Sequence, residues 1–244
     1  MTSYEFLINP AYMKAALVCA STEETRYYLK GVCFQKRDNI MRMISTDGHR
    51  LFVAVQPVDI DGGAPDFDVI LPLADLKKGL TGVTSKVEFI SCGFHLNDAA
   101  DRVFLAAVNN VSMTPVDGTY PDVTRLLPND RAAESKEPQQ FNATYIGDMA
   151  KIAKALGLRG NNVHLQHCGG SPAIVSFGGR DDVMALLMPI RTGHDDGPIG
   201  TIRAGQLLGA APLSEQLTSG QAAELTLTKI YCLTGGGVTL PLLL

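Results

Sequence analysis

Histidines and their acidic neighbours are the side chains that could support acid–base or metal chemistry in this chain. The 244 residues include five histidines: His49, His95, His164, His167 and His194. The sequence contains no His-Glu-x-x-His pattern, no Gly-x-Ser-x-Gly elbow and no phosphate-binding loop. His164 and His167 fall in a predicted strand, where residues three apart point to opposite faces and cannot share a metal. A hydrolase that uses His49 with Asp47 or Asp122 is the enzyme hypothesis, but we expect no enzyme, no metal and no cofactor.

The amino-acid composition limits which classes of protein this chain can belong to. The five cysteines include no Cys-x-x-Cys pair, which argues against a disulfide framework and a structural zinc site. The net charge is −4, so any contact with DNA requires a local concentration of positive charge. The N-terminus lacks the features of a signal peptide, and no apolar run approaches the ~20 residues of a membrane span. We therefore expect a cytoplasmic protein.

Short strands and short helices alternate through residues 1–128 and predict an antiparallel α+β module. Asn9-Pro10 is a typical helix start, because Asn caps the helix and Pro occupies its first position. Pro72 opens a second short helix at about 73–80. The expected strands are 4–8, 27–36, 40–46, 50–57, 69–71, 86–91, 102–108 and 111–116.

A second module is expected at 140–244, after a polar linker at 129–139. Asn142 is a predicted helix cap, and Tyr145, Met149, Ile152, Ala153 and Leu156 share one helical face, for which core packing is the default interpretation. The expected strands are 163–167, 173–177 and 183–188. The remaining segment, 192–244, has a helix-like stretch and an apolar hairpin pattern at 224–244.

One short segment, Thr46-Asp47-Gly48-His49-Arg50-Leu51, is the most informative motif. By itself, Asp47-Gly48 could be only a hairpin turn. Three more segments accompany it, in the order found in a known family. The segment before it is Arg26-Tyr27-Tyr28-Leu29-Lys30-Gly31, and the segments after it are Gly118-Thr119-Tyr120-Pro121-Asp122 and Met188-Pro189-Ile190-Arg191. Together they resemble the bacterial DNA polymerase III beta subunit, the beta sliding clamp.

The resemblance implies a DNA-clamp fold with two modules, each made of antiparallel sheets with two short helices on the inner face. Residues 1–128 resemble the middle domain of the clamp, and residues 140–191 resemble the end of its last domain. Nothing resembles the first domain, and the first half of the last domain is missing after Pro128. The segment 192–244 could complete the second module in permuted order.

Clamps of this family bind short peptides of polymerases and repair proteins in an apolar pocket between the middle and last domains. The resemblance assigns that pocket to Leu29, Thr46, Gly48, His49, Arg50, Leu51, Pro121, Arg125, Leu126, Asn142, Tyr145, Met188, Pro189, Ile190 and Arg191. Apolar members can bury an anchor side chain, and polar members can hydrogen-bond the peptide. Met188-Pro189 could instead be only the end of an edge strand.

Clamps also line a channel with basic helices that hold duplex DNA through its phosphates, without sequence preference. The candidate DNA-binding residues are Tyr27, Tyr28, Lys14, Lys77, Lys78, Lys151, Lys154 and Arg159. Scattered cations of this kind also occur on any solvated helical face.

The leading hypothesis is a sliding-clamp-like processivity factor that encircles duplex DNA and binds polymerase peptides, with a clamp loader as a further candidate partner. Rings of known clamps have six similar modules, so a chain with two modules predicts a homotrimer. The alternative is a clamp-derived interaction protein that binds or sequesters such peptides without encircling DNA. The oligomeric state distinguishes the two.

Overall fold

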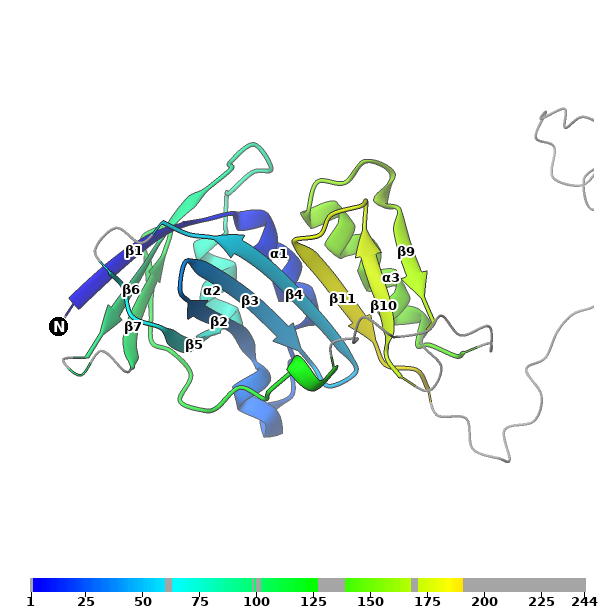
Figure 1. Cartoon of the computed structure of the whole chain (residues 1–244), viewed down its shortest axis with the longest axis horizontal. Coiled ribbons are helices and arrows are strands. Elements are labelled where there is room, and N and C mark those ends of the chain that lie inside the picture. The colour runs from blue at the N-terminus through cyan, green and yellow to red at the C-terminus, as the bar shows by residue number, and fades with distance from the viewer. Residues whose placement is uncertain are drawn as a thin grey trace, which may run out of the picture. The chain divides into compact units, whose positions relative to one another are not determined.

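The computed structural model describes residues 2–59, 63–97, 99, 102–126, 139–167 and 171–190, all within one compact unit, Met1–Thr192. Two antiparallel sheets and three α-helices organise this unit (Figure 1). The predicted linker falls almost entirely outside the described residues, as do Arg191 and the segment 192–244.

The smaller sheet has four strands in the order β1-β6-β7-β8. The larger sheet has seven strands in the order β5-β2-β3-β4-β11-β10-β9. The strand bounds are β1 Thr2–Ile8, β2 Gly31–Arg37, β3 Ile40–Thr46, β4 Arg50–Pro57, β5 Phe67–Pro72, β6 Ile90–Leu96, β7 Val103–Val108, β8 Val111–Met113, β9 Val163–Gln166, β10 Ala173–Phe177 and β11 Val183–Leu187.

The helices are α1 Pro10–Cys19, α2 Leu73–Gly79 and α3 Ala143–Ala155, with short 3₁₀ turns η1 Glu24–Leu29, η2 Thr124–Leu126 and η3 Arg159–Asn161. All three α-helices contribute to one continuous apolar core with one face of the seven-stranded sheet (Figure 1). The other face has a smaller apolar cluster, over which the segment leading to η2 passes. This second face contains the candidate site.

Both predicted helix caps are confirmed. The Asn9 side chain accepts a hydrogen bond of 2.9 Å from the backbone N–H of Ala11, and Pro10 is the first helical residue. The Asn142 side chain accepts one of 2.9 Å from Thr144. Each cap satisfies an N–H group that has no partner within its helix.

Several predicted strand bounds were wrong. Residues 27–29 belong to η1 rather than to a strand, and the N–H of Lys30 closes that turn onto the carbonyl of Tyr27 at 3.0 Å. Strand β6 begins at Ile90, not at 86, because residues 84–89 are exposed and contact no core that would favour a strand. Strand β8 ends at Met113 rather than at 116.

The seven-stranded sheet joins the two predicted modules. Strand β4 pairs with β11, so Leu51 lies opposite Leu186 and Arg50 lies opposite Leu187. The N–H of Met188 continues the pairing by donating to the carbonyl of His49 at 2.8 Å. The β3–β4 turn therefore lies beside the end of β11. In the described part of the chain, no helix is long and apolar enough to cross a membrane.

Candidate functional site: the hollow between the β3–β4 turn and β11

The β3–β4 turn is held by its own side chains. Thr46 Oγ1 accepts from the N–H of Gly48 at 3.0 Å and donates to the carbonyl of Arg50 at 2.7 Å. Asp47 Oδ1 accepts from the N–H groups of His49 at 2.9 Å and Arg50 at 3.0 Å. Gly48 has φ +91°, a conformation that glycine adopts at little cost. The turn interpretation was thus correct, and the same turn also forms a wall of the site.

A small hollow opens between this turn, β11 and η2, with a cavity volume of about 30 Å³. It is lined by six residues predicted for the peptide pocket and by two that were not: Thr46, Gly48, Arg50, Leu51, Leu126 and Met188, with Pro172 and Leu186. Leu186 could have been predicted, because it precedes Met188 by two residues on a strand and so faces the same side. No sequence pattern indicated Pro172, which lies directly before β10 and reaches the hollow from there.

Arg50 has partners of its own. Its Nε donates to Asp47 at 3.0 Å, and its Nη1 donates to Asp148 on α3. The side chains of Arg50 and Asp148 are 12% and 9% exposed, so this ion pair is largely shielded from water. Burial alone would raise the pKa of Asp148, but hydrogen bonds from Lys151 (2.6 Å) and Arg50 hold it below its usual value. Arg50 therefore lines the hollow and also joins the turn to α3.

Tyr145 brings the first turn of α3 to the edge of the site. The His49 ring stacks on it with centroids 5.8 Å apart and an interplanar angle of 19°. The Arg50 guanidinium lies 4.8 Å from the Tyr145 ring centroid, within range of a cation–π contact. Asn142, the cap of this helix, is exposed nearby in the chain. The rings of His49 and Tyr145 and the Arg50 guanidinium form a polar and aromatic rim beside the hollow.

The other predicted pocket residues do not line the hollow. Leu29 is buried, and its carbonyl accepts from the N–H of Ser21 at 3.0 Å. Pro121 and Arg125 are exposed, and Arg125 lies 3.8 Å from Asp122. Pro189 and Ile190 follow Met188; the N–H of Ile190 donates to the carbonyl of Gln140 at 2.8 Å, and its side chain is 49% exposed.

A second feature, a basic groove, lies between the start of α1, the end of α3 and the loop before β6. Its cavity volume is about 520 Å³. Five cations and one acid line it: Lys14, Lys86, Lys151, Lys154, Arg180 and Glu88. Lys14, Lys151 and Lys154 were predicted to bind DNA, and the structure places them together.

The other DNA candidates lie apart from the lining of the groove. Lys77 and Lys78 are exposed on α2, where Lys78 pairs with Asp75 at 2.8 Å. Arg159 is exposed in η3. Tyr27 and Tyr28 contact each other edge to face in η1, with ring centroids 5.7 Å apart.

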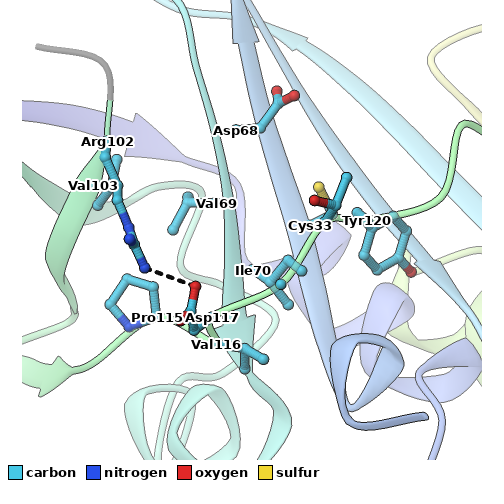
Figure 2. A pocket seen from close by; sticks show the side chains of 12 residues that line it. Cys33, Asp68, Val69, Ile70, Arg102, Val103, Pro115, Val116, Asp117 and Tyr120 are labelled. Carbon is cyan, nitrogen blue, oxygen red and sulfur yellow. Dashed lines mark hydrogen bonds and ion pairs between the residues drawn. The ribbon is translucent and has the colours of Figure 1, made fainter.

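A third cleft of about 350 Å³ lies beside β5 and under residues 115–120 (Figure 2). Its charged side chains are already paired: Arg102 with Asp117 at 2.8 Å, and Asp68 with Arg37 at 2.8 Å. Among the described residues, no group of three or more His, Cys, Asp or Glu side chains could hold a metal.

Comparison with known proteins relates this fold to one class of proteins, the DNA clamps. Residues 11–122 match the family model "DNA polymerase III beta subunit, central domain". The beta sliding clamp of Streptococcus pneumoniae is 31% identical over 140 residues, which are 56% of this chain and 32% of that protein. The beta sliding clamp of Escherichia coli K12 is 30% identical over 135 residues, which are 52% and 34% of the two chains.

Solved structures agree on the fold. The DNA polymerase III beta chain of Streptococcus pneumoniae superposes with a TM-score of 0.57 at 23% identity, over 79% of this chain and 66% of that one. The beta subunit of Thermotoga maritima gives a TM-score of 0.57 at 17% identity, with the same coverages. The chain is related to the beta sliding clamps, and its residues 11–122 match the central domain of that family. It spans about a third of the length of the curated relatives that it matches.

Proposed function

We propose that this chain is a sliding-clamp-like processivity factor that binds short partner peptides in the hollow between the β3–β4 turn and β11. One observation supports this most. Six predicted residues from three separate segments, 46–51, 126 and 188, line a single hollow. Pocket-forming side chains that are distant in sequence and adjacent in space are typical of a binding site. The proposal assigns no catalysis, and the relatives are named as sliding clamps.

The hollow must open to accept an anchor. Its volume of about 30 Å³ is roughly the space of one water molecule, too little for a leucine or phenylalanine side chain. Met188 is the lining residue best able to move, because it is partly exposed, stands at the end of β11 and has a flexible side chain. Binding therefore includes a rotation of Met188 away from Leu51 and Leu186.

Calorimetry with the peptide Gln-Leu-Ala-Leu-Phe tests the proposal. The intact protein is expected to bind with micromolar affinity, about −8 kcal/mol. Met188→Lys should abolish binding, because an anchor would then bury an unpaired charge. Leu51 is only 2% exposed, so charging it would test folding rather than binding.

Ile146→Lys is the matched control, since Ile146 is an apolar residue 46% exposed on α3 that does not line the hollow. The control should bind the peptide as the wild type does. Equal affinity of Met188→Lys and wild type would refute the proposed pocket.

The basic groove supports a second part of the proposal, a channel surface for duplex DNA in a ring of three chains. Lys14, Lys86 and Lys154 converge there from three segments that are far apart in sequence. Cations gathered in a groove hold phosphates without reading bases. A cytosolic setting, expected from the sequence, and a clamp loader as a candidate partner belong to the same proposal.

A further inference from the structure

A fourth hollow lies on the same sheet face as the proposed peptide pocket. Its cavity volume is about 280 Å³, and its apolar lining comes from β3, β4, β11 and the residue before η2: Ile44, Val53, Val55, Met184 and Val123. The polar edge is formed by Gln35, Arg42, Thr124, Asp181 and Asp182. This hollow is already open, whereas the proposed anchor pocket is nearly closed.

The two hollows share a continuous apolar floor. Leu51 and Leu186 are paired across β4 and β11 beneath the first hollow, and Val53 and Met184 are the next pair on the same face beneath the second. Leu51, Val53 and Leu186 belong to one apolar cluster, against which Met184 packs. Both hollows also share one wall, because Val123 and Thr124 border the second and Leu126 borders the first.

Strand geometry sets the distance between these pairs. Two residues along a strand span about 6.6 Å, and an extended peptide advances by the same amount between side chains on one face. A peptide lying along β4 and β11 would therefore place residue i over the Leu51–Leu186 pair and residue i+2 over Val53–Met184. Residue i+4 would lie over Val55, the next residue of β4 on this face; Arg42 lies opposite Val55 on β3, and on the other side the N–H of Val55 donates to the carbonyl of Asp182 at 2.8 Å.

The positive charge of Arg42 indicates which type of residue the ligand carries at position i+4. Arg42 lies at the edge of the second hollow, and no ion pair involves it among the described residues. Asp182 is already paired with Arg180, whereas the Arg42 guanidinium, without a carboxylate partner, favours an acidic residue of the ligand. Gln35, opposite Arg42 on β2, can add a hydrogen bond.

We propose that the second hollow is a further subsite for the partner peptide, one that takes an apolar residue two positions from the anchor and an acidic residue four positions from it. This inference rests on the proposed function, because it extends the peptide from the Leu51–Leu186 pocket. The partner is thus an extended segment with the pattern anchor-x-Val-x-Asp, or its reverse along the chain.

Fluorescence anisotropy with three labelled peptides tests the subsite on the intact protein. The short probe is Gln-Leu-Ala-Leu-Phe. One long probe adds Gly-Val-Gly-Asp after Phe, and the other adds Asp-Gly-Val before Gln, so that in each probe valine is two positions and aspartate four positions from an anchor. One long probe should bind about tenfold more tightly than the short one, because burial of the valine side chain and the pairing of its aspartate with Arg42 both add to the affinity.

Arg42→Glu should remove most of that gain and leave the affinity for the short probe unchanged. Replacing Asp by Lys in the long probe should restore the gain for Arg42→Glu alone. Arg159→Glu is the charge-matched control, since Arg159 is exposed in η3 and lies outside this hollow. It should behave as wild type.

The outcomes separate this subsite from the pocket on which it depends. If the short probe binds and neither long probe gains affinity, the subsite is refuted while the pocket stands. The subsite is also refuted if Arg42→Glu and Arg159→Glu change the gain equally. If the short probe does not bind, the proposed pocket fails and the subsite fails with it.

Discussion

Arg50 shows what residue types reveal and what they leave open. The sequence assigned it to a peptide site as a hydrogen-bond donor, and the structure does place it in the lining of the hollow. Its guanidinium, however, is bound by Asp47 and Asp148. Asp47 is three residues away, and its role could be read from the turn. Asp148 is 98 residues away, and it reaches Arg50 because β4 pairs with β11 and because α3 packs against α1 in the shared core.

Removing the charge of Asp148 should destabilise the protein. Asp148→Asn leaves Arg50, 12% exposed, with one carboxylate instead of two. Breaking a buried pair from one side costs roughly 3–5 kcal/mol, and the value here should lie below that range because Asp47 remains. Urea unfolding of the variant measures the decrease in stability. The control Asp122→Asn, in an exposed loop, should change stability by less than about 0.5 kcal/mol.

The lowered pKa of Asp182 predicts how the stability of the fold depends on pH. A hydrogen bond from Arg180 and one from Tyr12 lower the pKa of Asp182, while burial and this carboxylate raise the pKa of Tyr12 to about 12. A carboxyl whose pKa is lower in the folded state stabilises the fold above its unfolded pKa, about 3.9. That contribution is lost as the pH falls through the folded value.

Urea unfolding at several pH values checks this expectation. The stability difference between wild type and Asp182→Asn should be constant from pH 7 to 5 and shrink below about pH 4. Asp181→Asn, at the exposed neighbouring position, is the control. A difference that grows with acidity would contradict the assigned direction.

At the scale of elements, local signals predicted helix starts well and edges of strands poorly. Asn9-Pro10 and Asn142 determine their helices by contacts within a few residues, so the sequence was sufficient. Residues 27–29 have the aromatic character of a strand, yet they form a 3₁₀ turn; β2 begins at Gly31, where pairing with Pro72 of β5 constrains the backbone. That constraint involves residues about 40 positions later and has no local signal.

Gly31 and Gly147 should respond in opposite directions to alanine. A Cβ at Gly31 would lie 2.4 Å from the carbonyl oxygen of Leu71, a backbone atom that cannot move aside, so Gly31→Ala should cost about 1–3 kcal/mol. A Cβ at Gly147, exposed inside α3, meets nothing within 4 Å. Gly147→Ala should stabilise by about 0.5–1 kcal/mol, because glycine weakens a helix interior. Thermal unfolding of both variants measures the two shifts.

At the scale of the whole molecule, the basic groove predicts how the protein binds duplex DNA. Duplex binding should be weak, independent of sequence and sensitive to salt. Lys86→Gln with Lys154→Gln should reduce the slope of log affinity against log salt by about 0.9 for each phosphate that is no longer neutralised. Lys77→Gln with Lys78→Gln is the matched pair on α2, outside the groove lining, and should change the slope less. An equal change in both pairs would place the DNA elsewhere.

The ring hypothesis predicts assembly as well as binding. Light scattering should give three times the chain mass of 26.1 kDa, and a closed circular plasmid should retain the protein longer than a linear one. A monomer with equal retention on both would favour the alternative, a clamp-derived protein that binds peptides without encircling DNA.

The central claim is that partner peptides bind in the hollow of Leu51, Leu126, Pro172 and Met188, and photo-crosslinking locates the peptide directly. A Gln-Leu-Ala-Leu-Phe peptide with benzoylphenylalanine in place of its last residue would be irradiated with the intact protein, and mass spectrometry would identify the labelled residue. Labelling of those four residues or their immediate neighbours is the expected result. Labelling confined to the cleft of Ile70, Val103 and Val116 (Figure 2), or to the basic groove, would contradict it.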